Sequence, residues 1–318
     1  MFKKFLSISI FLFFVSNVRA ENLETLFTAP DIFVTSKIKP ATEFEGDRGN
    51  ILFDAHELEK KIQYSIGGIL DDLPGLSSSS LGNASRPIIR GMANSRIKIL
   101  QNGSSLSDVG EFGEDHIVAY DPMLIEKIEI IKGPATLLYG NNAFAGVINI
   151  INPLINLDGT VSDKIAQANF GYSTSGGELK SALKAGQTIG DFTVRGTGSF
   201  LSSGSYDLAN TSSKQQNSAK QSFTGGLGFT YNDGNDHIGF SVDKLEAEYS
   251  LPGGEGVENR TSLNPTRNTF NFRASKSINS KIIDRFNFEA TVSEYSHAER
   301  VLMDKHNIEF FNDTYEFK

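Results

Sequence analysis

The sequence predicts a small α+β domain followed by an antiparallel transmembrane β-barrel, with about the first eight barrel strands present. Two observations lead to this fold class. After Asp158 apolar and polar side chains alternate with a period of two, whereas the preceding residues mix short apolar runs with helix signals. The chain also has 24 Phe although only 39% of its residues are hydrophobic. So many aromatic rings in so polar a chain indicate a surface that faces lipid rather than an ordinary packed core.

The first twenty residues have the pattern of a secretory signal peptide. Lys3 and Lys4 precede an apolar stretch from Phe5 to Val15, and Val18-Arg19-Ala20 resembles a cleavage site. The apolar stretch is well short of the ~20 residues that a membrane-spanning helix needs. We therefore expect residues 1–20 to be removed on export.

The next part of the chain, to about Ile155, is predicted to be the α+β domain. Asp54 is a plausible cap for a helix that runs to about Ile62, and the helix signals end at Asp71–Gly75. Ser77–Ser80 is predicted to be a polar loop. Three apolar runs next to Gly or Pro predict short strands, at Arg96–Leu100, Ile125–Ile131 and Val147–Ile151.

The barrel prediction rests on strands whose two faces differ in chemistry. In Phe223–Tyr231 the odd positions are Phe, Gly, Leu, Phe and Tyr, and the even positions are Thr or Gly. The same alternation recurs at 192–200, 237–242, 270–275 and 285–292. A soluble β-sandwich is the alternative, but its core face favours Val, Ile and Leu over aromatic residues and Gly.

The length of the alternating region sets a limit on the barrel. Residues 159–318 hold about eight strands, and an eight-stranded barrel has room for little more than its own side chains. About 22 strands are needed to enclose a domain. We therefore expect either a fragment of a longer protein or a domain that lies outside the barrel, and we favour the fragment.

Several motifs occur in an order that resembles one family. They are Leu73-Pro74-Gly75, Arg86–Gly91, Arg96–Gly103, Ile125–Gly140 and Ala143–Ile150. Together they resemble the plug domain of TonB-dependent outer-membrane receptors, with small departures at Lys132 and Ala145. The residues that carry the resemblance are Arg86, Arg90, Gly91, Asn102, Gly103, Glu126, Glu129, Gly133, Pro134, Tyr139, Gly140, Gly146 and Asn149.

The resemblance implies a division of the chain and an inner-membrane partner. Residues 49–155 would be the plug and 156–318 the N-terminal part of a 22-stranded barrel, whose outer face meets outer-membrane lipid. Residues 21–48 would hold a TonB box and linker, the box being Asp31, Ile32, Phe33, Val34 and Thr35. Such a segment adds as a strand to a partner's sheet edge, here TonB of the TonB–ExbB–ExbD complex. Arg90, Glu126 and Glu129 would form ion pairs that hold the plug in the barrel.

The cargo that the resemblance implies is a scarce metal ion, with zinc favoured. Asp115-His116 resembles the plug pair that binds metal in the zinc-uptake branch of the family. His297 and Glu299 lie on the polar face of their predicted strand, so these four residues would supply the four ligands that Zn²⁺ prefers. The segment 253–258 is acidic and lacks His, which leaves room for another metal or a metal complex.

Other functions are less compatible with the sequence. With no Cys there is no thiolate chemistry, and the metalloprotease, nucleotide-loop and nucleophile-elbow motifs are missing, so we expect no enzyme activity and no catalytic cofactor. A net charge of −8 gives no basic surplus for nucleic acid. A siderophore or haem receptor of the same family, or a non-transporting adhesin of the outer membrane, remain the alternatives.

Overall fold

The computed structural model describes residues 51–54, 58, 65–71, 73–106, 108–110, 113–140, 142–155, 164–252, 260–278, 280, 283–301 and 306–318. All of them belong to one compact unit, Phe33–Lys318. The expected signal peptide, the TonB box and the acidic segment 253–258 lie outside the described residues. So does most of the helix expected between Asp54 and Ile62.

The N-terminal domain is built on a five-stranded sheet. Its strand order is β1-β6-β7-β4-β5, and β7 pairs with β4 in parallel while the other neighbours are antiparallel. The three strands predicted from apolar runs are confirmed to within two residues as β4, β6 and β7. The bounds are β1 Ile51–Asp54, β4 Ile97–Gln101, β5 Ser104–Ser105, β6 Lys127–Ile131 and β7 Gly146–Ile151.

Short helical segments and isoleucine side chains complete this domain. Ser65 caps helix α2 (Ile66–Leu70) by accepting a hydrogen bond from Gly68 N at 3.1 Å, and the helix packs its isoleucines into the core. Ile128, Ile148 and their neighbours on β6 and β7 are fully buried there. The 3₁₀ segments are η3 Asn94–Arg96, η4 Pro122–Leu124, η5 Pro134–Tyr139 and, in the second sheet, η6 Ser175–Gly177.

The predicted polar loop at Ser77–Ser80 is wrong. These serines lie in β2 (Leu76–Leu81), which pairs with β3 (Ala84–Ile89) as an antiparallel hairpin. Gly82 takes a left-handed φ of +60° at the turn, where a residue without Cβ is favoured. β3 pairs with all six residues of β2, although Pro87 opposite Ser78 offers no N–H, and this pairing makes the serine run a strand in spite of its low intrinsic preference.

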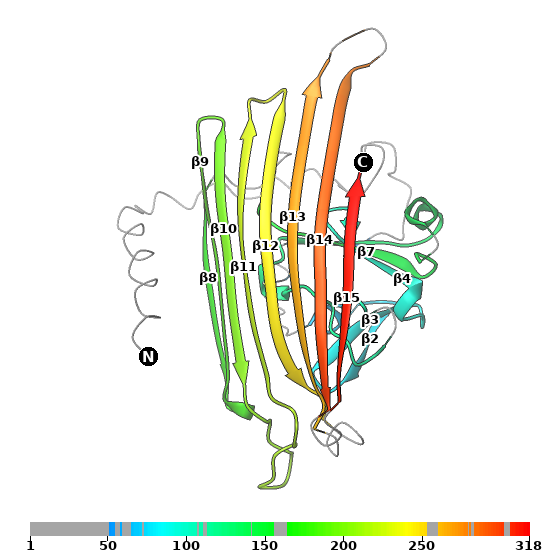
Figure 1. Ribbon diagram of the computed structural model, residues 1–318, viewed down its shortest axis with the longest axis vertical. Helices are drawn as coiled ribbons and strands as arrows, with labels where there is room; N and C mark the ends of the chain where they lie inside the picture. Colours follow the sequence, from blue (N-terminus) through cyan, green and yellow to red (C-terminus); the bar gives the residue numbers. More distant parts are fainter. Residues whose placement is uncertain are drawn as a thin grey trace. The chain divides into compact units, whose positions relative to one another are not determined.

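The rest of the described chain forms one eight-stranded antiparallel sheet. Its strands run side by side in chain order from β8 to β15, as Figure 1 shows. This confirms the predicted number of strands and their orientation. The bounds are β8 Lys164–Ser173, β9 Glu178–Ile189, β10 Phe192–Ser203, β11 Lys220–Asn232, β12 His237–Ser250, β13 Ser262–Ser277, β14 Arg285–Val301 and β15 His306–Phe317.

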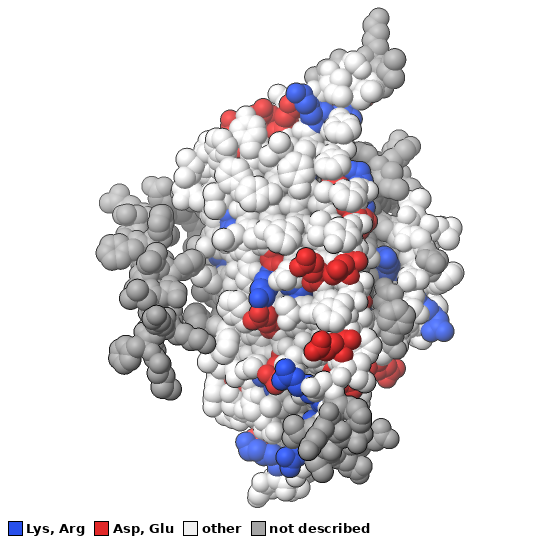
Figure 2. Space-filling model, in the orientation of Figure 1, with Lys and Arg blue, Asp and Glu red and all other residues white. Residues whose placement is uncertain are grey.

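The two faces of this sheet follow the predicted parity. Outward side chains such as Phe170, Leu227 and Phe240 are more than half exposed, whereas Arg195 and Arg267 on the other face are almost fully buried. Figure 2 shows few charged side chains over β8–β11, with acidic ones gathered over β14 and β15. The outward face therefore has the apolar surface expected for contact with lipid. Among the described residues, no helix is long and apolar enough to cross a membrane.

Candidate functional site

Basic side chains on the inward face of the sheet hold the N-terminal domain by its backbone. Lys184 Nζ donates to Ile125 O at 2.6 Å and lies 3.6 Å from the Glu126 carboxylate, and Arg195 donates to Pro153 O at 3.0 Å. The ion pair expected for Glu126 is therefore present. Carbonyl oxygens of chain segments next to strand ends are good acceptors for such cations, because no sheet neighbour occupies them.

A second group of contacts joins Gln101 to two opposite charges of the sheet. Arg267 donates to Gln101 Oε1 at 2.6 Å, and Gln101 Nε2 donates to Asp243 Oδ1 at 3.1 Å. Arg267 and Asp243 also pair with each other at 3.4 Å, and the guanidinium lies over the ring of Tyr120. Gln101 thus contacts both members of a buried ion pair, which offsets part of the cost of removing the two charges from water.

The sequence motifs of the N-terminal domain meet in one hydrogen-bond network. Asn149 Oδ1 accepts from Gly103 N and Asn149 Nδ2 donates to Glu129, both at 2.8 Å, while Asn102 Oδ1 accepts from Asn152 N at 3.0 Å. Glu129 thus accepts a hydrogen bond from within the domain, and its expected ion pair with the barrel wall stays a prediction. Because Glu129 and Asn149 are opposite each other in the pairing of β6 with β7, this hydrogen bond joins neighbouring strands.

The remaining motif residues form turns and local contacts. Arg90 and Gly91 take φ values of 50° and 76°, and Arg90 N donates to Gly75 O at 2.9 Å, which joins the Leu-Pro-Gly step to the end of β3. Arg90 is exposed, and its expected ion pair with the barrel wall stays a prediction. Gly133 and Gly140, also with positive φ, flank η5, whose Tyr139 packs on Leu100, Ile131, Ala143 and Val147.

Two histidines 181 residues apart face each other between the two parts of the structure. His116, in a loop of the N-terminal domain, places its Nε2 atom 3.3 Å from Nε2 of His297, which points inward from β14. Their rings meet edge to face at 4.9 Å between centroids. His297 is buried, and Phe310 of β15 stacks on it at 4.6 Å.

The other nitrogen of each ring already has a partner. Nδ1 of His116 lies 2.7 Å from Asp115 Oδ1, and this pairing lowers the pKa of the Asp115 carboxyl. Nδ1 of His297 lies 3.3 Å from the hydroxyl of Tyr295, two residues away on the same strand face. With a carboxylate close to one Nδ1 atom and a hydroxyl close to the other, the two Nε2 atoms face each other.

Comparison with known proteins shows what these elements belong to. Residues 50–147 match the family model described as TonB-dependent Receptor Plug Domain. They form a TonB-dependent receptor plug domain. The predicted fold, an α+β plug followed by antiparallel barrel strands, is confirmed by solved structures that superimpose on both parts of the chain. We refer to these parts as the plug and the barrel sheet.

Three solved structures illustrate the similarity. The copper transporter OprC is 21% identical over 79% of this chain, with a TM-score of 0.64. A mutant of the ferric enterobactin receptor PfeA from Pseudomonas aeruginosa is 13% identical over 92% of the chain, also with a TM-score of 0.64. The FrpB iron transporter from Neisseria meningitidis is 14% identical over 82% of it, with a TM-score of 0.63. The chain spans 38%, 47% and 44% of these three proteins.

The structure brings together part of the predicted metal site. His116 and His297 meet, and Asp115 lies behind His116 rather than beside both rings. Glu299 shares the inward face of β14 with His297, one side-chain step further along the strand. Within the described parts of the chain, no three His, Cys, Asp or Glu side chains are placed to hold one metal ion, so the four-ligand set is not assembled.

Sequence reasoning missed two residues that support the histidines. Tyr295 was detectable, because it lies two positions from His297 and therefore on the same strand face. Tyr249 of β12 was not: its hydroxyl donates to Asp115 O at 2.9 Å and accepts from Ile117 N at 3.3 Å, across 134 and 132 residues. No local pattern indicates such a contact.

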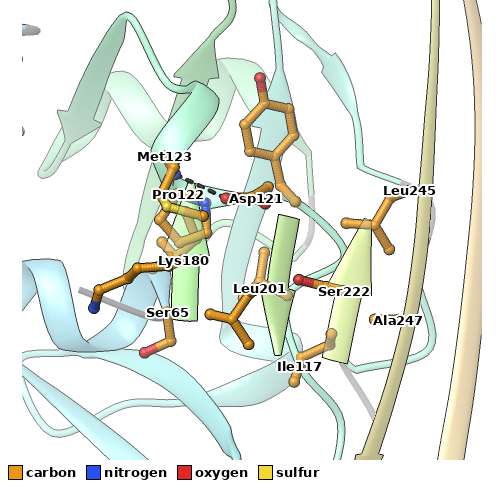
Figure 3. Close-up of a pocket in the computed structure, with 13 residues that line it drawn as sticks. Ser65, Ile117, Asp121, Pro122, Met123, Lys180, Leu201, Ser222, Leu245 and Ala247 are labelled. Carbon is orange, nitrogen blue, oxygen red and sulfur yellow. Dashed lines mark hydrogen bonds between the residues drawn. The ribbon is translucent and has the colours of Figure 1, made fainter. Parts of the chain in front are cut away.

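A small cavity of about 30 Å³ lies between the plug and the barrel sheet, next to the loop that carries His116. Figure 3 shows Ile117, Asp121 and Lys180 among the side chains around it. Asp121 is buried and accepts hydrogen bonds from Met123 N at 2.9 Å and from the Ser199 hydroxyl at 2.5 Å. Burial raises the pKa of Asp121 above its usual value of 3.8.

Proposed function

We propose that the protein is an energy-coupled receptor of the Gram-negative outer membrane that takes up a scarce metal ion, with zinc as the favoured cargo. The plug match and the apolar outward face of the barrel sheet support the class of protein. The facing histidines support the cargo. Export would depend on the predicted signal peptide, residues 1–20.

The observation that carries the metal proposal is the distance between the two Nε2 atoms. Zinc binds imidazole nitrogen at about 2.0–2.1 Å, so two ligands at a tetrahedral angle lie about 3.3 Å apart. The Nε2 atoms of His116 and His297 are 3.3 Å apart. An ion placed between them would therefore meet two nitrogen ligands at the spacing that it needs.

The structure suggests different roles for the four predicted ligands. His116 and His297 would bind the ion directly, and Asp115 would hold the ring of His116, as carboxylates commonly do behind metal-bound histidines. Glu299 is the candidate third ligand, because it lies on the same strand face as His297. Water or a group of a metal complex would fill the remaining position.

The placement of the two histidines also fits energy coupling. His116 belongs to the plug and His297 to the barrel sheet, so a force that displaces the plug would separate the two ligands. The proposed source of that force is TonB of the TonB–ExbB–ExbD complex, acting through the box Asp31–Thr35. Replacing Ile32 or Val34 by Pro should abolish uptake and leave metal binding intact, because Pro removes a backbone donor needed for strand addition. Uptake that survives both changes would place the box elsewhere.

The decisive experiment is metal titration of the purified full chain against a competing chelator. Replacing His116 or His297 by Ala should weaken zinc binding at least ten- to a hundredfold, the range seen when even outer partners of a metal ligand are lost. His237→Ala, at the opposite end of β12 from Tyr249, is the matched control and should bind like the wild type. Equal affinity in all four proteins would refute the site.

Two further outcomes separate the alternatives. Imidazole nitrogen also binds copper, and the similar structure OprC is described as a copper transporter, so tighter binding of copper than of zinc would reassign the cargo. Binding of a ferric siderophore or of haem, unaffected by either histidine change, would favour that class of receptor. If the protein shows neither metal binding nor TonB-dependent uptake, the result would favour an adhesin.

A further inference from the structure

The loop that carries His116 is hydrogen-bonded on one side by the plug and on the other by the barrel sheet. On the plug side, Arg86 donates to the carbonyls of His116 and Ile117 at 3.5 and 3.3 Å, and its guanidinium lies 3.8 Å from the Asp108 carboxylate. A Cβ on Gly110 would fall 1.6 Å from this guanidinium, so the loop closes tightly around Arg86. The plug therefore determines the path of the loop from one side.

On the other side the loop is held by one hydroxyl of the barrel sheet. Tyr249 donates to the carbonyl of Asp115 and accepts from the amide of Ile117, so its two hydrogen bonds flank His116. A single oxygen that bonds both residues next to His116 fixes the backbone from which this side chain projects. Because His297 also projects from the barrel sheet, both rings are placed relative to the same sheet.

The ring of Tyr249 is itself fixed. It is 1% exposed and packs with Ala84 of the plug hairpin and with Leu251 and Leu263 of the barrel sheet. The strand end beside it is anchored by the plug, because Asn83 Nδ2 donates to Ser250 O at 3.1 Å. The hydroxyl therefore has a defined position before any cargo arrives.

The position of Tyr249 in the sheet explains why it can serve both histidines. Tyr249 pairs with Leu263 in the antiparallel register, and Leu263 pairs with Glu299 of β14. Tyr249 therefore lies in the same cross-strand row as Glu299, and His297 is two residues away from that row on β14. A shift of the His116 loop relative to Tyr249 would change the distance between the two Nε2 atoms directly.

We infer that Tyr249 is a positioning residue for the metal site: its hydroxyl fixes the Asp115–Ile117 backbone so that His116 Nε2 meets His297 Nε2. The inference rests on the proposed function for its metal-binding consequence. Its structural part, the restraint on the loop, is independent of any cargo.

The test is Tyr249→Phe in the full chain, which removes the hydroxyl and keeps the packed ring. Hydrogen exchange at single-residue resolution, without metal, should show the Ile117 amide exchanging about two- to tenfold faster, because it loses its acceptor. The Ile148 amide, in the core of the plug, should be unchanged and thus reports that overall stability is kept. Tyr172→Phe, outward-facing on β8 and 70% exposed, is the matched control.

The second measurement is zinc affinity, with Co²⁺ absorption as a report on the ligands. Tyr249→Phe should weaken zinc binding about tenfold, and its Co²⁺ spectrum at saturation should match the wild type because both histidines still bind. The inference is overturned if Ile117 exchange is unchanged, or if zinc affinity is unchanged while His116→Ala weakens it. If the wild type binds no metal but Ile117 responds, the proposed function fails and the restraint on the loop stands.

Discussion

A methyl group added at Gly228 tests how closely the plug approaches the barrel sheet. Gly226 and Gly228 of β11 face inward, where sequence parity also places Thr224 and Thr230. A Cβ on Gly228 would fall 2.0 Å from the carbonyl oxygen of Leu154 and 2.6 Å from its carbonyl carbon. Leu154 belongs to the segment that leaves the plug after β7, so this glycine makes room for backbone and not for a flexible side chain.

The magnitude follows from how firmly that backbone is held. Ordinary Cβ contacts begin near 3.4 Å, so Gly228→Ala requires a shift of about 1.4 Å. Arg195 donates to Pro153 O and Asn152 accepts from Leu154 N, and both bonds oppose the shift. We expect a loss of about 2–3 kcal/mol of unfolding free energy, toward the upper end for overpacked sites.

Two neighbouring glycines calibrate this expectation. At Gly226 the added Cβ would meet the flexible end of the Leu154 side chain at 2.7 Å, so Ala should cost about 1 kcal/mol. Gly225 faces outward with its nearest neighbour at 3.7 Å. There Ala should be neutral or stabilise by about 0.4–1 kcal/mol, because it restricts the unfolded chain.

The assay is urea unfolding of the chain folded into lipid vesicles, followed by circular dichroism because the sequence has no Trp. From the highest urea midpoint to the lowest, the expected order is Gly225→Ala, wild type, Gly226→Ala and then Gly228→Ala. Equal midpoints for the alanine variants of Gly225 and Gly228 would refute the close approach of Leu154 to the sheet.

Three further changes test the plug. Asn83→Ala should cost about 1–3 kcal/mol, because three carbonyls beside β11 and β12 lose their donor; the urea midpoint checks this. Asn149→Ala should cost about 1.5–3 kcal/mol in the same assay, because Glu129 and Gly103 lose a partner in the buried network. Asp121→Asn addresses pH. The raised pKa means that Asp121 holds its proton more tightly in the folded protein than in the unfolded chain. Its contribution to the free energy of unfolding is therefore full below about pH 3.8 and declines as pH rises toward the folded pKa. The Asn variant should lack this decline when midpoints are measured between pH 3.5 and 8; an unchanged slope would contradict it.

Sequence parity was a good guide to the barrel sheet because a strand has only two faces. Once Phe286 and Phe288 were assigned to lipid, His297 and Glu299 had to face inward, and both do. The strands of the plug were also predictable, because runs such as Ile125–Ile131 are rich in isoleucine and lie near Gly or Pro. In both cases the deciding information lies within a dozen neighbouring residues.

Predictions that depend on distant partners were weaker. Ser77–Ser80 has the composition of a loop, and its strand depends on a hairpin partner that local polarity does not reveal. His116 and His297 were singled out through family resemblance and strand parity, but the place of Asp115 behind His116 depends on a loop path set by Arg86 and Tyr249. These contacts become buried only when plug and sheet pack together, so the hydrophobic periodicity of the sequence does not predict them.

The distribution of apolar clusters indicates where the plug is most firmly attached. The described residues form two further apolar clusters besides the isoleucine core. One lies within the plug, around Val147. The other joins plug and sheet, and its members are Ala84, Ile117, Tyr249, Leu251 and Leu263. Water can replace hydrogen bonds between plug and sheet, such as that from Arg195 to Pro153 O, at a small net cost. Apolar contact at this corner has no such replacement. His116 is next to Ile117 of this cluster, so an ion bound between His116 and His297 would add a link between plug and sheet beside the apolar contact.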